Sequence, residues 1–500
     1  MPYDVIVVGA GSAGCVAAAE LTRRGVGRVL VLEAGSSDLH PFVAIPMGLT
    51  WLMGSSRDWA LKTTAQEAAG GRQIGVPRGK MVGGSGSINS MVWFRGRSAD
   101  FDGWGVPGWG FADVAPVFEE IETHLTPHQL TNTHPLTQGL RAMLPTNSGV
   151  PTPDRESAGA FSHNMKGGRR NSAARAYLRR YDIPVTTGAP VDRLVMRGGR
   201  AVGVRLVDGT EIAATKGVVL SAGSLMSPAI LMRSGIGDKA ALSALGIDSR
   251  VDLPGVGQNL HDHPGYGLHF ERAGSGYGLE PAQWPMWAAA PFMLPFGKGP
   301  LASPTVEGGA FFNARGEDGP PDVQTHFIPF HLDHQGKKYS MKSGYFADVC
   351  LCRPKSRGEL TLASKDPKAP PNIDLGLFRD DSDLDTMVHG VERLRGLLEQ
   401  ADFGTRRGRE VAPGADVTGK ALKEAIRNGA GTAYHPVGTC RMGEDADAVV
   451  SPALAVNGME GAWVVDASVM PAVTSANTNA PSMMIGWKGA EAIATSLGVA

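Results

Sequence analysis

The chain has 500 residues, 42% of them hydrophobic and 19% charged, which is enough apolar surface for large cores and too little charge for a disordered protein. Its 48 basic and 49 acidic residues give a net charge of −1, which argues against a nucleic-acid surface. The four cysteines exclude a fold built on disulfides, and their spacing indicates no metal site. We therefore expect a globular protein with a small neutral partner and no metal.

The chain begins MPYDVIVVGAG and lacks the basic and apolar regions of a secretory signal. Its most apolar stretch, residues 284–296, contains three prolines and is too short to cross a bilayer of about 30 Å. Together with the few cysteines, these features predict a cytoplasmic protein without a transmembrane segment.

Residues 4–33 have the pattern of a βαβ unit, with strands at 4–8 and 28–32 and an alanine-rich helix at 15–24. The first turn, GAGSAG at residues 9–14, is a GxGxxG motif in the context that a dinucleotide site requires. Its glycines allow a tight turn, close approach of a pyrophosphate and close helix packing. Glu33 ends the second strand, where a carboxylate can accept a hydrogen bond from a ribose hydroxyl.

The identity of the dinucleotide stays open at this point. NAD and FAD both use this turn, and Glu33 disfavours only a 2′-phosphate, as in NADP. The alternative is a strand-to-helix turn without a ligand, which the complete βαβ context makes less favourable.

A second glycine-rich segment, RGKMVGGSGSINS, covers residues 78–90. Its small side chains and free backbone N–H groups suit packing against a planar ring or a phosphate. A flexible linker is the alternative, but linkers do not continue directly into an apolar run such as MVWF.

The middle of the chain contains several expected elements. Short helices are expected near 113–122 and 173–181, followed by a β-meander over 185–217 and a core strand at 218–221. Residues 266–430 alternate strand-like runs with loops and look like a separate, mostly antiparallel domain with one helix near 382–400. The histidines between these elements lack metal-ligand spacing, and we expect them to be exposed: His124, His128, His134 and His163.

From residue 431 onward the chain reads GTAYHPVGTCRMG, and we expect a strand at 463–465, an irregular loop at 466–481 and a helix at 482–494. The N-terminus of that helix receives the loop. We expect an anionic group to lie there.

Four segments in this order resemble the glucose-methanol-choline oxidoreductases, the FAD-dependent alcohol oxidases and dehydrogenases, along essentially the whole chain. They are VIVVGAGSAGCVAAAEL with VLEAG, RGKMVGGSGSINSMVWFRG, GSLMSPAILMRSGIG, and YHPVGTCRMG with VVDASVMPAVTSANTNAP. The resemblance implies an α/β fold with a Rossmann-like FAD-binding domain (residues 1–100, 182–265 and 431–500). It also implies an α+β substrate-binding domain with a mostly antiparallel sheet (residues 101–181 and 266–430).

The same resemblance implies which residues contact FAD. Residues of the first turn and Glu33 would bind the ADP half, and Val191 would meet the adenine side. Gly83, Gly84 and Asn89 would lie along the flavin, and Asp466 would approach the pyrophosphate. The full implied set is Gly9, Gly11, Ser12, Ala13, Gly14, Glu33, Ala34, Met81, Val82, Gly83, Gly84, Ser85, Asn89, Val191, Ala222, Gly223, Asp466, Ala467, Asn479 and Pro481.

His435 and Asn479 match the positions where the resemblance places a catalytic pair. Oxidising an alcohol requires loss of the hydroxyl proton and of a hydride, so a neutral imidazole at His435 would act as base. Asn479 would donate a hydrogen bond to the developing alkoxide. A core histidine and an Asx-type cap are the structural alternatives for these two residues.

The chain departs from some relatives at Ile88, where they carry a histidine that holds FAD covalently, so non-covalent FAD is expected. Residues 125–170 look shortened, and Glu307 is either a pocket-side carboxylate or a solvated loop residue. Six aromatic residues could line an apolar pocket or belong to the core: Trp284, Trp287, Phe292, Phe296, Phe327 and Phe330.

The predicted activity is oxidation of a primary alcohol to an aldehyde, with oxygen or a quinone-like carrier as the electron acceptor. Two alternatives that the resemblance leaves open are a lyase that keeps FAD as structure, of the hydroxynitrile lyase type, and a flavin photodecarboxylase. The sequence leaves the particular alcohol, the acceptor and the oligomeric state open.

Overall fold

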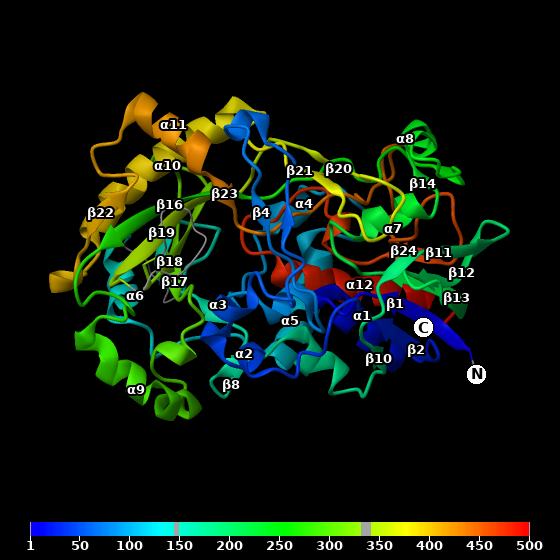
Figure 1. Cartoon of the computed structure of the whole chain (residues 1–500), viewed down its shortest axis with the longest axis horizontal. Helices are drawn as coiled ribbons and strands as arrows, with labels where there is room; N and C mark the ends of the chain where they lie inside the picture. The colour runs from blue at the N-terminus through cyan, green and yellow to red at the C-terminus, as the bar shows by residue number, and fades with distance from the viewer. Residues whose placement is uncertain (1, 145–149, 332–341, 500) are drawn as a thin grey trace.

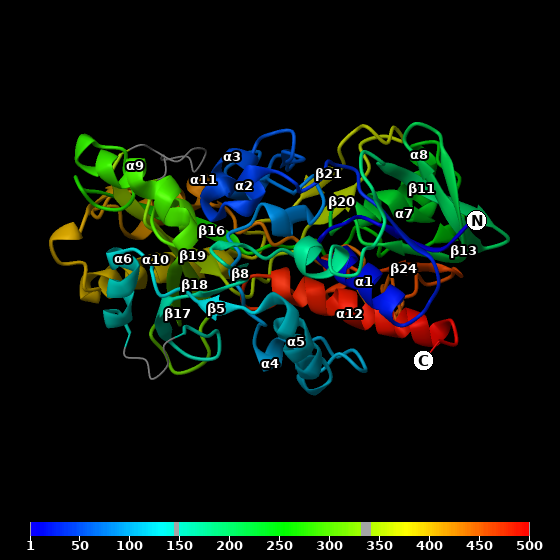
Figure 2. The same cartoon turned by 90° about the horizontal axis from the view of Figure 1, so that it is seen from below.

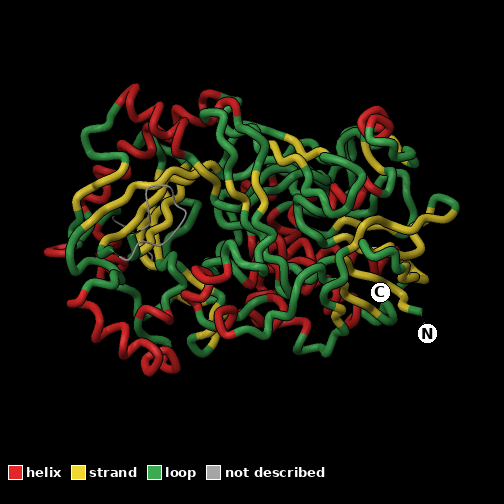
Figure 3. The backbone as a smooth tube through the Cα atoms, viewed as in Figure 1, coloured by secondary structure: helices red, strands yellow, loops and turns green. Residues whose placement is uncertain are grey.

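The computed structural model describes residues 2–144, 150–331 and 342–499. Two sheets lie at opposite ends of an elongated molecule, and both chain termini lie at the end that contains the first sheet (Figure 1). Between the sheets, loops and short elements fill much of the molecule (Figure 3).

The first sheet has seven strands in the order β10-β2-β1-β13-β12-β11, with β24 paired to β13. Neighbours from β10 to β13 and the β13–β24 pair are parallel, whereas β11 and β12 continue the sheet antiparallel. The central strands are apolar along their length because helices and loops cover both faces. The strands are β1 (Tyr3–Val8), β2 (Val29–Leu32), β10 (Val185–Thr186), β11 (Val191–Arg197), β12 (Arg200–Leu206), β13 (Glu211–Leu220) and β24 (Ala462–Val464).

Helices α1 (Ser12–Arg23) and α12 (Asn479–Ser496) lie side by side against this sheet (Figure 2). Their close approach depends on Gly486, where an added Cβ would lie 2.4 Å from the carbonyl oxygen of Ala13. The packing brings the N-terminus of α12, from the end of the chain, beside the N-terminus of α1.

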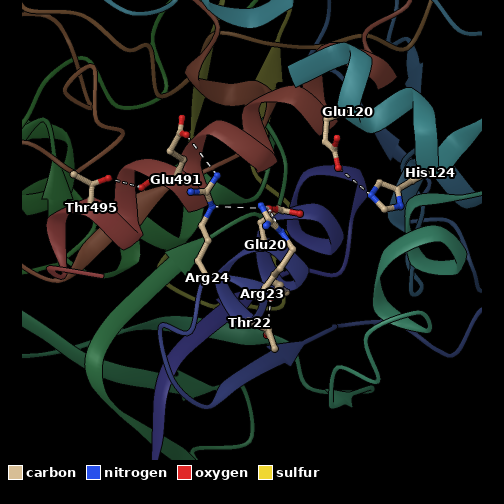
Figure 4. A network of polar contacts seen from close by, with 9 residues as sticks. Glu20, Thr22, Arg23, Arg24, Glu120, His124, Glu491 and Thr495 are labelled. Carbon is tan, nitrogen blue, oxygen red and sulfur yellow. Dashed lines mark hydrogen bonds and ion pairs between the residues drawn. The ribbon is translucent and has the colours of Figure 1, made fainter. Parts of the chain in front are cut away.

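Charged residues join the other ends of these helices (Figure 4). Arg23 donates to the buried Glu20 at 3.0 Å, and Arg24 pairs with Glu20 at 3.8 Å and with Glu491 of α12 at 3.5 Å. Part-exposed ion pairs of this kind contribute about 0–1 kcal/mol each, so the apolar contact between the helices carries most of the stabilisation.

The second sheet is antiparallel throughout, as the sequence predicts, in the order β22-β16-β19-β18-β17-β6 with β23 paired to β16. Helix α10 (Asp381–Gln400) packs on it, with Gly390 against Val349. The strands are β6 (Ser157–Ala160), β16 (Pro264–Glu271), β17 (Gly308–Phe312), β18 (Val323–Ile328), β19 (Gly344–Leu351), β22 (Arg409–Ala412) and β23 (Gly431–Thr432).

Part of the segment assigned to the substrate-binding domain packs on the first sheet's helices instead. Helix α5 (Phe111–Leu125) contacts α12, and a π-helical turn at Ala174–Leu178 contacts α1. Trp104 also donates its indole hydrogen to the carbonyl oxygen of Ala472. The proposed domain boundaries stay a prediction, and these contacts place residues 101–125 and 174–178 closer to the other domain.

The remaining elements are short and surround the two sheets. The helices are α2 (Pro41–Ala44), α3 (Leu49–Leu52), α4 (Ser98–Asp102), α6 (Pro135–Gly139), α7 (Ser227–Arg233), α8 (Lys239–Ala244), α9 (Trp284–Met293) and α11 (Gly419–Gly429). The strand pairs are β3 (Leu61–Lys62) with β4 (Gly75–Val76), β5 (His128–Gln129) with β7 (Ser162–His163), β8 (Met165–Lys166) with β9 (Arg169–Arg170), β14 (Ile236–Gly237) with β15 (Val251–Asp252), and β20 (Glu359–Thr361) with β21 (Asn372–Asp374).

Two expectations about single residue types have opposite outcomes. All four cysteines are buried, and for Cys350 and Cys352, which alternate along one expected strand, the sequence predicts small buried side chains. The expected exposure of the four histidines is wrong for three of them: His163 is fully buried, His124 and His134 are partly buried, and His128 is exposed. Burial of the His163 ring is partly offset by a hydrogen-bond contact, since its Nε2 atom lies 2.8 Å from the Val306 carbonyl oxygen. Within the described residues, no helix combines the length and apolar character that crossing a membrane would require.

Candidate functional site

A cavity of about 1460 Å³ lies between the two sheets. Its walls come from the β1–α1 turn, the segment after β13, strands β18 and β19, and the loop before α12. Ligand pockets commonly measure roughly 300–1,000 Å³, so this cavity has room for a dinucleotide and a second small molecule.

The glycines of the β1–α1 turn serve different purposes. An added Cβ at Gly9 would lie 2.4 Å from the Ser221 carbonyl oxygen, and one at Gly14 would lie 2.0 Å from the Gly9 carbonyl oxygen. At Gly11 the nearest such atom is 3.9 Å away, and this residue lines the cavity. Gly9 and Gly14 are therefore required by the protein's own packing, whereas Gly11 leaves space on the ligand side.

Glu33 lies at the end of β2, as predicted, with a buried carboxylate. Its oxygens accept hydrogen bonds from the backbone N–H groups of Ala10, at 3.0 Å, and Gly35, at 2.8 Å. Burial raises the pKa of Glu33 to about 7, although these N–H groups and the charge of Lys80 oppose the rise. Each carboxylate oxygen has further lone pairs for a ligand hydroxyl.

Asp466, at the end of β24, holds the neighbouring chain segments together. Its Oδ2 accepts from the backbone N–H of Gly223 at 2.8 Å and from the Ser227 hydroxyl. Burial raises the pKa of this carboxyl group, and the hydrogen bonds counteract the rise. This arrangement fixes Gly223 and Ala467 at the cavity wall.

Most of the predicted FAD residues line the cavity, and five do not. Gly14, Met81, Val82, Gly83 and Pro481 lie outside its wall. Gly14 is needed for helix packing, and Met81 belongs to a small apolar cluster with Val43, Leu52 and Ile88. The residues that line the cavity are Gly9, Gly11, Ser12, Ala13, Glu33, Ala34, Gly84, Ser85, Asn89, Val191, Ala222, Gly223, Asp466, Ala467 and Asn479.

At the other end of the cavity, His435 contacts Asn477. The His435 Nε2 atom and the Asn477 amide nitrogen are 3.2 Å apart. The same amide nitrogen lies 3.3 Å from His326 Nε2, and the Asn477 oxygen accepts from Gln324 at 3.0 Å. Three hydrogen-bond partners therefore fix the orientation of Asn477 inside the cavity.

Asn479, which the sequence analysis paired with His435, occupies a different place. The helix begins at Asn479 and not at residue 482, so this side chain belongs to the first turn of α12. Its oxygen accepts from the Ser12 hydroxyl at 2.7 Å, and its buried amide nitrogen has no partner in the protein. The segment SANTNAP contains two asparagines two residues apart, and the start of the helix decides which one reaches the histidine.

His263 and Asp262, which the sequence analysis missed, complete the surroundings of His435. The two Nδ1 atoms of His263 and His435 are 3.0 Å apart, and His263 Nε2 is 3.0 Å from the Thr474 carbonyl oxygen. The backbone N–H of His435 donates to Asp262 at 2.8 Å. Burial lowers the pKa of His263 to about 4 and that of His435 well below its usual range, so both rings are neutral near pH 7.

A second imidazole lies across Asn477. His326 Nδ1 is 3.1 Å from an Asp348 carboxylate oxygen, and both residues line the cavity. Burial lowers the pKa of His326, but the charge and the hydrogen bond of Asp348 outweigh it and raise the pKa overall. The sequence offered only the motifs NLHDHP and QTHF as signals for these residues.

Asp262, His263 and His435 also form the one cluster of potential metal ligands found in the part of the chain that the structure describes, with ligand atoms within 4.8 Å of one another. Two of those atoms are the Nδ1 atoms that already contact each other at 3.0 Å. The described geometry therefore uses them for a hydrogen bond.

The aromatic residues proposed for an apolar pocket divide into three groups. Trp287 and Phe330 line the cavity, whereas Phe327 is fully buried in the core. Trp284, Phe292 and Phe296 are exposed, on α9 and the turn that follows it. Tyr277 and Phe346 add further aromatic surface to the cavity.

Glu307 is neither solvated nor part of the cavity wall. Its carboxylate is buried and accepts hydrogen bonds from Tyr277, Thr137 and the His134 backbone.

Comparisons with known proteins cover both halves of the chain. Residues 3–265 and 354–486 match the N-terminal and C-terminal family models described as GMC oxidoreductase. An alcohol dehydrogenase [acceptor] of Pseudomonas putida is 35% identical, over 100% of this chain and 97% of that protein. An oxygen-dependent choline dehydrogenase of Sinorhizobium medicae (strain WSM419) is 36% identical, over 99% of this chain and 96% of that protein. The crystal structure of pyridoxine 4-oxidase from Mesorbium loti is 28% identical with a TM-score of 0.85, covering 98% of both chains.

Proposed function

The chain belongs to the GMC oxidoreductases, and from that premise we propose that it oxidises an uncharged primary alcohol to an aldehyde, with FAD as its cofactor. One observation carries the proposal. His435 and Asn477, 3.2 Å apart, lie in the same cavity as the dinucleotide-binding turn. A base and a hydrogen-bond donor thus lie together beside a site of sufficient size for the cofactor.

The residues at the dinucleotide end fit FAD. We infer that the parallel strands around β1 form a Rossmann-like unit, with Gly11 beside the pyrophosphate and Glu33 at the ribose. The unpartnered amide hydrogens of Asn479 are available to an acceptor on the cofactor. Binding is expected to be non-covalent, because Ile88 stands where a histidine would be needed for attachment. When bound, FAD supplies the hydride acceptor.

His435 is proposed as the general base. Its ring is neutral near pH 7 because burial lowers its pKa, so Nε2 can take the hydroxyl proton of the alcohol. When the alcohol binds, its oxygen replaces His435 Nε2 as the acceptor of one Asn477 amide hydrogen, and Asn477, held by Gln324, keeps donating that hydrogen as negative charge develops on the oxygen. Donors of this kind are worth roughly 2–4 kcal/mol in the transition state. Asn477 thus takes the role that the sequence analysis gave to Asn479.

The cavity favours an uncharged substrate. Among the described residues that line it, the carboxylates are Glu33, Asp348 and Asp466. Glu33 and Asp466 lie at the dinucleotide end, and Asp348 is paired with His326. In the described cavity wall, a cation such as choline would therefore meet no unpaired carboxylate beside His435, because Asp262 lies behind that residue and outside the wall. An apolar or aromatic alcohol would contact the side chains of Trp287 and Phe330.

Anaerobic titration of the yellow holoprotein with benzyl alcohol, 1-hexanol and choline tests this function. We expect the two uncharged alcohols to bleach the flavin and choline to bleach it weakly. Admission of air then distinguishes an oxidase, which reoxidises promptly, from a dehydrogenase that uses a quinone-like carrier. A yellow protein that no alcohol bleaches would contradict the proposal and favour lyase chemistry. A cytoplasmic location stays a prediction.

A further inference from the structure

A chain of hydrogen bonds leads from the backbone to the cavity through two imidazoles. It runs from the Thr474 carbonyl oxygen to His263, from His263 to His435, and from His435 to Asn477, with separations of 3.0, 3.0 and 3.2 Å. The first member of this chain can only accept a hydrogen bond, and this fact determines the position of every other proton.

The protons follow step by step. Because a carbonyl oxygen accepts only, His263 must carry its hydrogen on Nε2. A neutral imidazole has one N–H, so His263 Nδ1 is an acceptor, and the facing Nδ1 of His435 must carry the hydrogen. The Nε2 atom of His435 then carries no hydrogen, and its lone pair accepts from the amide of Asn477.

We propose that His263 is a positioning residue that holds His435 in its Nδ1-protonated tautomer and so presents Nε2 to the cavity as the free base. The inference rests on the proposed function of His435. In the other tautomer, Nε2–H would face the amide hydrogens of Asn477, and two unprotonated Nδ1 atoms would face each other. Both contacts would then be lost.

The same contact supports the base after it has reacted. When His435 takes a proton from the alcohol on Nε2, both ring nitrogens carry hydrogens, and Nδ1–H still donates to His263. A hydrogen bond from a charged donor is roughly twice as strong as a neutral one, so the contact strengthens as the charge forms.

Other charged or titratable groups act on His435 less directly. After burial, charge on His263, His326 or Arg78 disfavours a positive His435 ring, so the support from His263 depends on that ring staying neutral. Asp348 partly offsets His326 through its pairing with that residue. Asp262 contacts the backbone of His435 and not its ring. Within the described residues, His263 is the side chain that contacts the His435 Nδ1 atom.

Two substitutions separate the functions of the His263 ring. Asparagine can place an oxygen near the position of Nδ1 and keeps an acceptor for His435, whereas glutamine reaches the position of Nε2 and keeps only the contact with Thr474. In anaerobic reduction by benzyl alcohol, we expect His263→Gln to lower the plateau rate about 10- to 100-fold. The apparent pKa of the pH profile should also fall, because the His435 imidazolium loses its acceptor. His263→Asn should stay within about 5-fold of the wild type.

Nitrogen-15 NMR of the histidine-labelled holoprotein gives a readout independent of turnover. The His435 signals, assigned by their loss in His435→Gln, should show the hydrogen on Nδ1 in the wild type. They should show the Nε2-protonated or a mixed tautomer in His263→Gln.

An Nε2-protonated His435 in the wild type would overturn the inference, even if His263→Gln failed to fold. The inference would also be overturned if a folded His263→Gln protein that retains FAD showed an unchanged rate of reduction by benzyl alcohol and an unchanged pH profile. A wild type that no alcohol reduces would contradict the proposed function, and the NMR result would still decide the tautomer.

Discussion

The two ends of the cavity are built in different ways. The dinucleotide end is centred on residues close together in the sequence, GAGSAG at 9–14 and Glu33, and Asp466 and Asn479 join it from the end of the chain. The catalytic end brings together His263, Asn477 and His435 from distant segments, and it depends on side-chain hydrogen bonds. The first end is therefore centred on a local motif, whereas the second has no local motif that joins its residues.

The largest effect is expected at the dinucleotide end, from two glycines of one motif. Gly14→Ala would place a methyl group 2.0 Å from a backbone oxygen, so we expect a loss of about 3 kcal/mol or more in the free energy of unfolding. Gly11→Ala meets nothing closer than 3.9 Å and should leave the apoprotein's stability unchanged while weakening FAD binding about 10-fold or more.

Urea unfolding of the apoproteins and FAD titration measure the two quantities separately. Equal loss of stability in both variants would remove the distinction between a glycine required by packing and one that leaves space for a ligand.

A second matched pair of substitutions compares Asn477, which lies beside His435, with Asn479, which lies beside Ser12. Asn477→Ala removes the donor beside His435 and should slow flavin reduction by an alcohol about 30-fold or more, with FAD retained. Asn479→Ala removes the contact with Ser12 and should change FAD affinity more than the reduction step. Stopped-flow reduction at saturating alcohol, together with FAD titration, measures both. A larger reduction defect in Asn479→Ala would restore the assignment made from the sequence.

This pair also shows where prediction from sequence ended. The βαβ unit, the antiparallel second sheet and the presence of Glu33 and His435 at the cavity were predictable, because each depends on a local pattern or a local motif. The roles of Glu33 and His435 stay predictions. The choice between Asn477 and Asn479 depended on where α12 begins, and helix ends are the least certain part of a sequence prediction. The motif NLHDHP did not reveal the role of His263, because its partner His435 lies 172 residues away along the chain.

The smallest effects concern pH, and they have opposite signs in different parts of the molecule. The folded protein raises the pKa of Glu33 to about 7, so Glu33 stabilises the folded apoprotein most when the pH is below the ordinary pKa of a glutamate. This stabilisation is lost as the pH rises through 7. The folded protein lowers the pKa of His163 to about 4, so His163 stabilises the folded apoprotein most when the pH is above about 6.5. This stabilisation is lost as the pH falls through 4. Each contribution should amount to about 1 kcal/mol or more.

Urea unfolding from pH 4 to 8 checks these signs in the apoprotein. Glu33→Gln should remove part of the loss at high pH, and His163→Gln should remove part of the loss at low pH. If either variant kept the wild-type pH dependence, the burial of that group in the folded protein would not explain the pH effect.

The central claim is that His435 is the base that starts alcohol oxidation. The most direct test is the anaerobic reduction of FAD by benzyl alcohol in the wild type and His435→Gln, measured by rapid mixing across pH. We predict that the wild-type rate rises with pH to a plateau. The variant should keep its yellow FAD but reduce at least about 100-fold more slowly, without that rise. A His435→Gln protein that reduced at the wild-type rate with the same pH profile would contradict the claim.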